Sequence, residues 1–348
     1  MKFTRRAGLI AAATTALALT LSACGGTADS APASSTATAS AAFPVSIKHI
    51  YGTTEITEKP ERVATVSWVN ADAVLALGVV PVAMAEDTWG NNKQGSTDWK
   101  DAKLTELGAP IGSEKAPVQY SEKDGVNFTA LAEAQPDLIV AGYSGLTQEE
   151  YDKLSKIAPV IGPMAPNYTS GWQDVTTAVG QALGKDAEAK AVITEVEGKI
   201  AAAAEANPVF KDTTFIAGNL EPSDNSISLY ATGDSRPRFL TALGMTQAAI
   251  VDANAKDGEF FLPWAAERAN ELDSDIFFTW AAEGTGTDAI AKNKLFAQLP
   301  AVSKGGLVAA ANDMEVLAIS AASPLSVPYA VDKVVPAFAA AAQAAAGK

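Results

Sequence analysis

Aromatic and arginine side chains stand at or just after several predicted strands, and their types favour binding a large, flat ligand. The candidates are Trp68, Trp89, Trp99, Tyr143, Tyr230, Arg236, Arg238 and Trp280. Ligands of open α/β sheets bind beyond the carboxyl ends of the strands, where aromatic walls and arginine forks can hold a partly apolar chelate. Packing, helix capping and ion pairing are the alternative roles of the same residues. Tyr168 is a further candidate, whereas we expect Trp172, at a helix start, to lie in the core.

Residues that could carry catalysis are scarce. The chain has one histidine, His49, and one cysteine, Cys24. Nucleophilic triads need a histidine beside the nucleophile, and zinc or manganese sites cluster His, Cys and carboxylate ligands. The segment Gly142–Leu146 lacks the last glycine of a Gly-x-Ser-x-Gly elbow. We therefore predict a protein that is not an enzyme and holds no metal through its own side chains, with His49 an ordinary strand residue; a secreted hydrolase is a remote alternative.

Residues 1–23 have the layout of a secretory signal. A basic start precedes the uncharged, mostly apolar run Ala7–Leu21, which is too short to span a bilayer. The ending Leu-Ser-Ala-Cys resembles a bacterial lipobox, which implies cleavage before Cys24 and lipidation of its thiol. The pair Arg5 and Arg6 leaves general secretion and twin-arginine export both open. We expect the mature protein outside the cytoplasm, anchored to the cell membrane through Cys24.

The composition limits the partners of the mature chain. Residues 24–42 hold the lipidated cysteine and a flexible tether rich in Ala, Ser, Thr, Gly and Pro. The whole chain has 26 Lys and Arg against 40 Asp and Glu, for a net charge of −14. Three basic residues and no acid fall in the signal, so 23 basic and 40 acidic residues remain and the mature charge is −17. This acidic balance argues against nucleic acid and against membrane contact other than the lipid anchor, and a single cysteine excludes an internal disulfide.

From residue 43 on, short apolar runs alternate with helical patterns, which predicts an α/β fold with parallel sheets. The predicted strands are Arg62–Trp68, Val79–Met84, Pro136–Ala141, Thr213–Gly218, Ser226–Tyr230, Asp275–Trp280 and Met314–Ile319. The predicted helices between them include Ala71–Leu77, Phe128–Ala134, Gln148–Ile157, Arg236–Leu243 and Trp264–Glu271.

The pattern occurs twice, which predicts two lobes. The order helix, turn, aspartate and strand appears in Phe128–Ile139 and again in Ala266–Phe277. Between them, residues 186–206 carry an apolar stripe at helical spacing behind the N-cap candidate Asp186, and Asn-Pro ends the run. We predict an N-terminal lobe over 43–185, a connecting helix over 186–206 and a C-terminal lobe over 207–348.

Several short motifs together resemble one known family. They are Lys59–Val63, Leu75–Val79, Ala134–Ile139, Tyr143–Tyr151 and Ile157–Pro159, in addition to the lipobox and tether. Their order resembles the iron-siderophore substrate-binding lipoproteins of ABC importers, in an actinobacterial form, over roughly residues 43 to 340. The resemblance implies two lobes joined by one long helix, with the ligand held in the cleft between them. Because a single helix permits little hinge motion, we expect the cleft to close by a small tilt about residues 186–206.

The resemblance also implies partners. The ligand would be an Fe(III)-siderophore whose iron is coordinated by the chelate, with no resident cofactor; the family also includes haem and cobalamin binders, which leaves those two ligands open. The chain has no phosphate-binding loop of its own, so an ABC importer permease with its ATPase would drive import. Glu267 in the second lobe would dock on the permease. The matching position in the first lobe holds Thr129, so Glu133, one turn later, would take that role there. We expect a monomer, and the acidic charge favours neutral or cationic hydroxamates over anionic catecholates.

Overall fold

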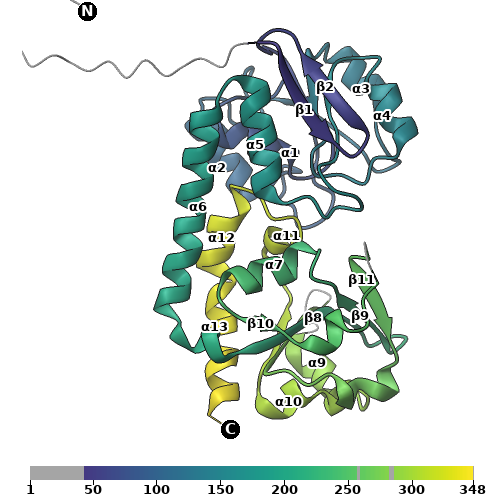
Figure 1. Ribbon diagram of the computed structural model, residues 1–348, viewed down its shortest axis with the longest axis vertical. Helices are drawn as coiled ribbons and strands as arrows, with labels where there is room; N and C mark the ends of the chain where they lie inside the picture. The colour runs from purple at the N-terminus through teal and green to yellow at the C-terminus, as the bar shows by residue number, and fades with distance from the viewer. Residues whose placement is uncertain (1–42, 257–258, 282–285, 348) are drawn as a thin grey trace, which may run out of the picture. The chain divides into compact units, whose positions relative to one another are not determined.

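The computed structural model describes residues 43–256, 259–281 and 286–347 (Figure 1). The predicted signal, Cys24 and the tether therefore lie outside the described residues. The described chain begins with an antiparallel hairpin of β1 (Val45–His49) and β2 (Gly52–Ile56), which the sequence analysis did not predict. His49 ends β1 and is partly buried, as expected of a strand residue. Among the described residues, none of the helices combines the length and apolarity that a membrane span requires.

The first lobe contains a five-stranded sheet in the order β5-β4-β3-β6-β7, and every pairing in it is parallel. Its strands are β3 (Val63–Thr65), β4 (Ala83–Ala85), β5 (Val118–Tyr120), β6 (Leu138–Val140) and β7 (Val160–Ile161). Its helices are α1 (Asn70–Ala76), α2 (Asp98–Glu106), α3 (Phe128–Glu133), α4 (Gln148–Leu154) and α5 (Trp172–Leu183). All residues of β3, β4, β6 and β7 are buried, which is typical of parallel strands covered on both faces.

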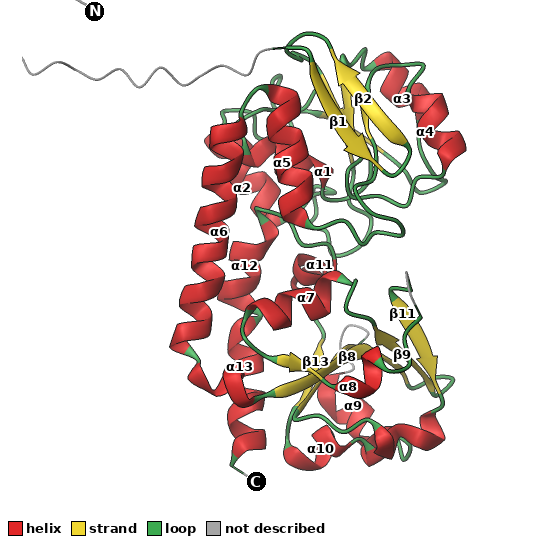
Figure 2. Ribbon diagram, in the orientation of Figure 1, coloured by secondary structure: helices red, strands yellow, loops and turns green. Residues whose placement is uncertain are grey.

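One long helix, α6, follows the first lobe and spans Asp186–Ala206, the predicted range. Its 21 residues rise about 32 Å at 1.5 Å per residue. Of the five residues of the predicted stripe, Ile193 is partly buried and the other four are buried: Ala189, Val196, Ile200 and Ala203. Figures 1 and 2 show α6 running along one side of both lobes.

The second lobe contains a sheet in the order β11-β9-β8-β12-β13, with β10 beside β8. Its strands are β8 (Thr214–Glu221), β9 (Ser226–Tyr230), β10 (Thr246–Gln247), β11 (Phe261–Trp264), β12 (Ile276–Trp280) and β13 (Leu307–Ala310). Its helices are η1 (Pro208–Asp212), α7 (Ser235–Ala242), α8 (Ala249–Asp252), η2 (Ala266–Glu271), α9 (Gly286–Lys292), η3 (Phe296–Gln298), α10 (Pro300–Lys304), α11 (Asp313–Ser320), α12 (Ser326–Lys333) and α13 (Val335–Ala346). Strand β9 pairs antiparallel with both β8 and β11, so this sheet is mixed, whereas both sheets were predicted to be parallel.

The main hydrophobic core runs through both lobes. It joins Val140 of the first sheet, Ile200 of α6 and Phe278 of the second sheet in one cluster of buried side chains. Helix α12 packs against α6, and the ring of its Tyr329 lies 5.1 Å from that of Trp99 in the first lobe. The C-terminal segment thus returns to the first lobe, so α6 is not the only structural connection between the lobes.

Two predicted elements of the second lobe were wrong. Met314–Ile319 was predicted as a strand but forms helix α11, because Asn312 caps its first turn by accepting hydrogen bonds from the Met314 and Glu315 amides. The apolar residues of this segment are buried in the helix. In so short a segment, periodicity alone does not separate a buried helix from a buried strand. Trp264–Glu271 was predicted as a helix, but Trp264 ends strand β11 and only Ala266–Glu271 is helical, as a 3-10 turn.

Candidate ligand-binding site

Trp68 and Tyr168 form an exposed aromatic surface on the first lobe. Their rings stack with centroids 6.0 Å apart and planes 19° apart, and each side chain is 41% exposed. Trp68 follows β3 through Ser67, which has a left-handed φ of 66°. The Ser67 amide donates to Glu122 Oε2 at 2.9 Å, so a side chain from another loop holds this turn. Burial raises the pKa of the Glu122 carboxyl.

Tyr143 connects this surface to the second lobe. Its ring lies 5.8 Å from that of Tyr168, and its hydroxyl donates to the Ser320 carbonyl at the end of α11 at 3.0 Å. Burial, and then the negative charge of Asp234, raise the pKa of Tyr143 to about 12, so the phenol is neutral and able to donate. Asn70 fixes the Tyr143 backbone by bonding both its amide and its carbonyl at 2.9 Å.

Arg236 and Tyr230 provide the second lobe's part of the site. The guanidinium carbon of Arg236 lies 3.3 Å from the centre of the Tyr230 ring, which is a cation–π contact. Asp234 accepts two hydrogen bonds from this guanidinium, at 2.7 and 2.8 Å. Burial alone would lower the pKa of Arg236, but the hydrogen bonds and charge of Asp234 outweigh it and raise that pKa. The positive charge of Arg236 is therefore neutralised locally.

Two tryptophans meet across the lobes. The Trp280 indole, at the end of β12, donates to the Tyr230 hydroxyl at 3.3 Å. Its ring lies edge-on to that of Trp89, from the loop after β4, with centroids 6.1 Å apart. Gly90 lets this loop approach α11, because a Cβ there would lie 2.8 Å from the Asp313 carbonyl oxygen and its φ is +64°.

These contacts form two runs of side chains, one from Trp68 to Tyr143 and one from Arg236 to Trp89, and the charges of Asp234 and Arg236 act on the Tyr143 phenol between them. We call the two runs together the interlobe aromatic group. Its members are Trp68, Tyr168, Tyr143, Arg236, Tyr230, Trp280 and Trp89. Six of the eight predicted ligand residues belong to it, together with Tyr168. The rule about the carboxyl ends of parallel strands does not apply to Tyr230, since β9 is antiparallel; a hydrogen bond from Trp280 joins it to the group.

The other two predicted residues lie outside this group. Trp99 is buried on α2, where its indole donates to Asp72 Oδ2 at 2.8 Å, so it packs in the interior. Arg238 is exposed on α7 and donates to the Thr169 carbonyl at 2.7 Å, which joins the second lobe to the loop that carries Tyr168.

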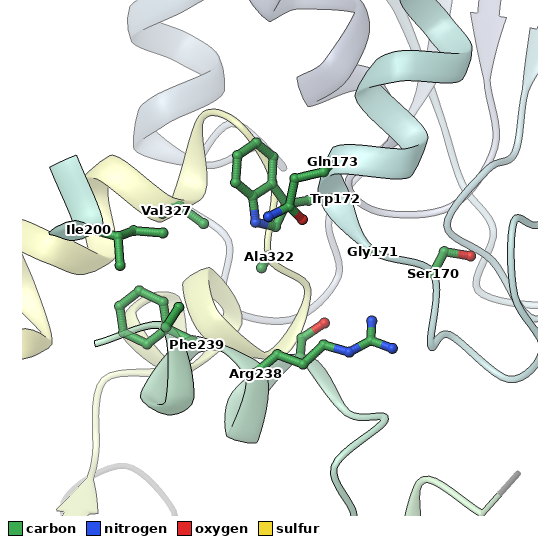
Figure 3. Close-up of a pocket in the computed structure, with 11 residues that line it drawn as sticks. Ser170, Gly171, Trp172, Gln173, Ile200, Arg238, Phe239, Ala322 and Val327 are labelled. Atoms are coloured by element: carbon green, nitrogen blue, oxygen red, sulfur yellow. The ribbon is translucent and has the colours of Figure 1, made fainter. Parts of the chain in front are cut away.

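Arg238 also borders a pocket of about 250 Å³ between α5, α6 and α7 (Figure 3). Trp172 and Gln173 from the start of α5 face Phe239 and Arg238 of α7 across it, and Ile200 of α6 closes one side. Trp172 starts a helix as predicted and is partly buried at this pocket rather than deep in the core. The lining is mostly apolar, and it lies beside the connecting helix.

The remaining predicted residues are on the surface. Glu133 is exposed at the end of α3, and Glu267 is exposed in η2. Within the part of the chain that the structure describes, no group of three or more His, Cys, Asp or Glu side chains could hold a metal ion. Cys24 lies outside the described residues.

Sequence reasoning missed the side chains that hold the aromatic loops. Asn70, Lys100 and Glu122 are examples, and each acts on a backbone far away along the chain. Nothing in local spacing marks such a residue. A lysine between Trp99 and Asp101 resembles any polar helix position until the fold shows it fully buried.

Two α/β lobes joined by a long helix, with an aromatic group drawn from both, define the class of two-lobe binding proteins. The sequence pattern of the periplasmic binding protein family matches residues 63–313, and the chain belongs to this family. The family consists of binding proteins, which confirms the prediction that the chain is not an enzyme.

Individual relatives agree with this assignment. YfiY of Bacillus subtilis, named a probable siderophore-binding lipoprotein, is 28% identical over 52% of this chain. FepB of Escherichia coli, named a ferric enterobactin-binding periplasmic protein, is 26% identical over 75% of this chain and 81% of its own. The structure of PiaA from Streptococcus pneumoniae in complex with ferrichrome is 29% identical, with a TM-score of 0.79 over 86% of this chain and 99% of PiaA. The chain spans only 61% and 50% of the length of two Bacillus subtilis relatives, the second of which is YfiY.

Proposed function

We propose that this protein captures a ferric siderophore outside the cytoplasm and delivers it to an ABC importer. The observation that carries the proposal is the interlobe aromatic group, because flat walls from both lobes can enclose a bulky, partly apolar chelate. Among the described residues no group of three or more His, Cys, Asp or Glu side chains could hold a metal ion, which supports iron that stays coordinated by the chelate. The names of YfiY and FepB and the ferrichrome complex of PiaA support the same class of ligand.

Within this class we propose a neutral or cationic chelate, such as a ferric trihydroxamate. Arg236 is ion-paired with Asp234 at 2.7 Å, so its charge is not free to balance a ligand. Glu122 lies beside the turn that carries Trp68 and adds negative charge whenever it is ionised. A ferric tricatecholate carries three negative charges, and the exposed arginine near these residues, Arg238, donates to the neutral carbonyl of Thr169.

The test is a titration of the mature protein carrying Cys24→Ser, followed by tryptophan fluorescence with inner-filter correction. Ferrichrome, ferric enterobactin, haemin and cyanocobalamin are the ligands. We expect saturable quenching by ferrichrome and none by the iron-free form. Tight binding of haemin or cobalamin with no binding of either ferric chelate would overturn the siderophore proposal, and a preference for enterobactin would overturn the charge argument alone.

Two variants locate the site. Trp68→Ala removes an exposed ring and should weaken ferrichrome binding at least tenfold, as expected for an aromatic anchor. Ile50→Ala is the matched control, because Ile50 is similarly exposed, at 39%, but lies at the β1–β2 turn. Equal affinities of the two variants would place the ligand elsewhere.

We also propose the lipid anchor and the docking residues that the sequence suggests. Cys24→Ser should move the protein from the membrane fraction to the soluble fraction of cells. Glu267→Arg and Glu133→Arg lie on exposed surface and should leave ferrichrome affinity unchanged while reducing uptake by the importer. Full uptake by the double variant would contradict docking through these glutamates.

A further inference from the structure

A buried ion cluster of Asp72, Lys100 and Asp87 lies in the first lobe, where it contacts the backbone of Trp68 and the loop that carries Trp89. Lys100 is 1% exposed and fully enclosed by protein. Its ammonium donates to both carboxylate oxygens of Asp87, at 2.7 and 3.0 Å, and lies 3.8 Å from Asp72 Oδ1. Asp72 is also fully buried. A buried cluster of this kind is a poor source of stability compared with apolar packing, so its residues call for another explanation.

Lys100 and Asp87 each hold a different part of the candidate site. The third hydrogen bond of Lys100 goes to the backbone carbonyl of Trp68, at 2.8 Å. Asp87 stands two residues before Trp89 on the same loop, so its bonds to Lys100 tie that loop to α2. An ammonium has three donors, and here they join the Trp68 turn to the Trp89 loop through one nitrogen.

Asp72 connects the cluster to the segment between α11 and α12. Its Oδ2 accepts from the Ser323 hydroxyl and from the Trp99 indole. Ser323 lies three residues after Ser320. The Ser320 carbonyl accepts the hydrogen bond from the Tyr143 hydroxyl that joins the lobes. The cluster therefore lies where the first lobe meets the returning C-terminal segment.

We propose that Lys100 and Asp87 are positioning residues for ligand binding, which set the Trp68 turn and the Trp89 loop at the spacing that the ligand requires. This inference rests on the proposed function for its affinity effect, but the positioning itself can be measured without any ligand. Asp72 supplies the second counter-charge of Lys100 and is not required to hold either loop.

The experiment uses the mature Cys24→Ser protein labelled with 5-fluorotryptophan and observed by ¹⁹F NMR. Trp68→Phe and Trp89→Phe assign the two resonances, and Trp264, buried in β11, is the internal reference. Asp87→Ala and Asp72→Asn are a matched pair, because each removes one carboxylate from the cluster and leaves Lys100 with the other.

We expect Asp87→Ala to shift and broaden the Trp89 resonance, while Asp72→Asn leaves both resonances in place. The neutral triple variant Asp72→Asn, Asp87→Asn, Lys100→Met should move both resonances and weaken ferrichrome binding about tenfold. Unmoved Trp68 and Trp89 resonances in folded Asp87→Ala or in the folded triple variant would overturn the proposal, as would equal shifts in both single variants. If the triple variant does not fold, the matched pair decides alone. If the resonances move but no ferric chelate binds the parent protein, the positioning role stands and the proposed function fails.

Discussion

Replacing Asp72 with asparagine tests whether this buried carboxyl costs the folded protein stability at neutral pH. Burial raises the pKa of Asp72 from 3.8 to about 6, and the attraction of Lys100 only partly offsets that rise. Asp72 Oδ1 is buried without a hydrogen-bond partner, which is consistent with a carboxylate that is poorly solvated by the protein. An asparagine keeps an oxygen that accepts from Trp99 and Ser323 and does not ionise.

Proton linkage determines whether the stability of the folded protein rises or falls with pH. Between pH 3.8 and about 6 the folded protein binds a proton at Asp72 that the unfolded chain has released, so its stability falls as pH rises through this window. A shift of two pKa units corresponds to about 3 kcal/mol, which is fully lost above the folded pKa. The asparagine variant escapes this loss, so its stability relative to the parent should improve by up to about 3 kcal/mol between pH 4 and pH 8.

The assay is thermal unfolding of both proteins, without ligand, at pH 4, 5, 6, 7 and 8. For a chain of this size, about 3 kcal/mol corresponds to a shift of about 5 °C in the midpoint difference. Other titrating groups are common to both proteins and largely cancel in that difference. Glu205→Gln, on the exposed end of α6, controls for the loss of one negative charge. A midpoint difference that is constant with pH, or that favours the parent protein increasingly at pH 8, would refute the reasoning.

Three further predictions test the site and the core. Gly145→Ala should displace Tyr168 from its stack, because the new Cβ would lie 2.5 Å from the ring; acrylamide should then quench Trp68 more strongly, and unchanged quenching would contradict the contact. Arg236→Ala should cost about 3 kcal/mol in urea unfolding by leaving Asp234 unpaired, against less than about 0.5 kcal/mol for exposed Arg238→Ala, and equal losses would contradict this assignment. Phe278→Ala should cost about 3–5 kcal/mol and lower a single unfolding transition, whereas two separate transitions would show that the lobes unfold independently.

Local signals explain which parts of the fold could be predicted from sequence. The range of α6 followed from its apolar stripe and from the Asn-Pro pair at its end, and each of these signals acts within a few residues. The strand orders and the antiparallel β9 could not be predicted, because pairing partners depend on contacts between distant segments. Helix α11 was predicted as a strand, although Asn312, which caps it, is a residue type that favours a helix start.

In the candidate site, the placement of each aromatic ring depends on contacts between segments that are distant in the sequence. Trp89 and Trp99 occupy the same connection between β4 and β5, and both were predicted to face the ligand. The structure separates them, because Trp99 lies on α2 with its indole on buried Asp72, whereas Trp89 stays in the loop and reaches Trp280 of the other lobe. The rule that ligands bind beyond strand ends selects the whole segment between β4 and β5. Only the tertiary contacts decide which aromatic ring of that segment can reach a ligand.

The same contacts bear on how the lobes would move around a ligand. The core is continuous through α6, and Val196 in the middle of that helix packs within it, so a large bend of α6 would expose apolar surface of both lobes. The direct contacts near the aromatic group are single bonds or ring edges, such as Tyr143 to Ser320 and Trp89 to Trp280. Such contacts are individually weak and can be exchanged for contacts with a ligand. We therefore expect opening to break the contacts around the aromatic group while the packing along α6 and α12 persists, which is a small tilt about the helix side of the molecule.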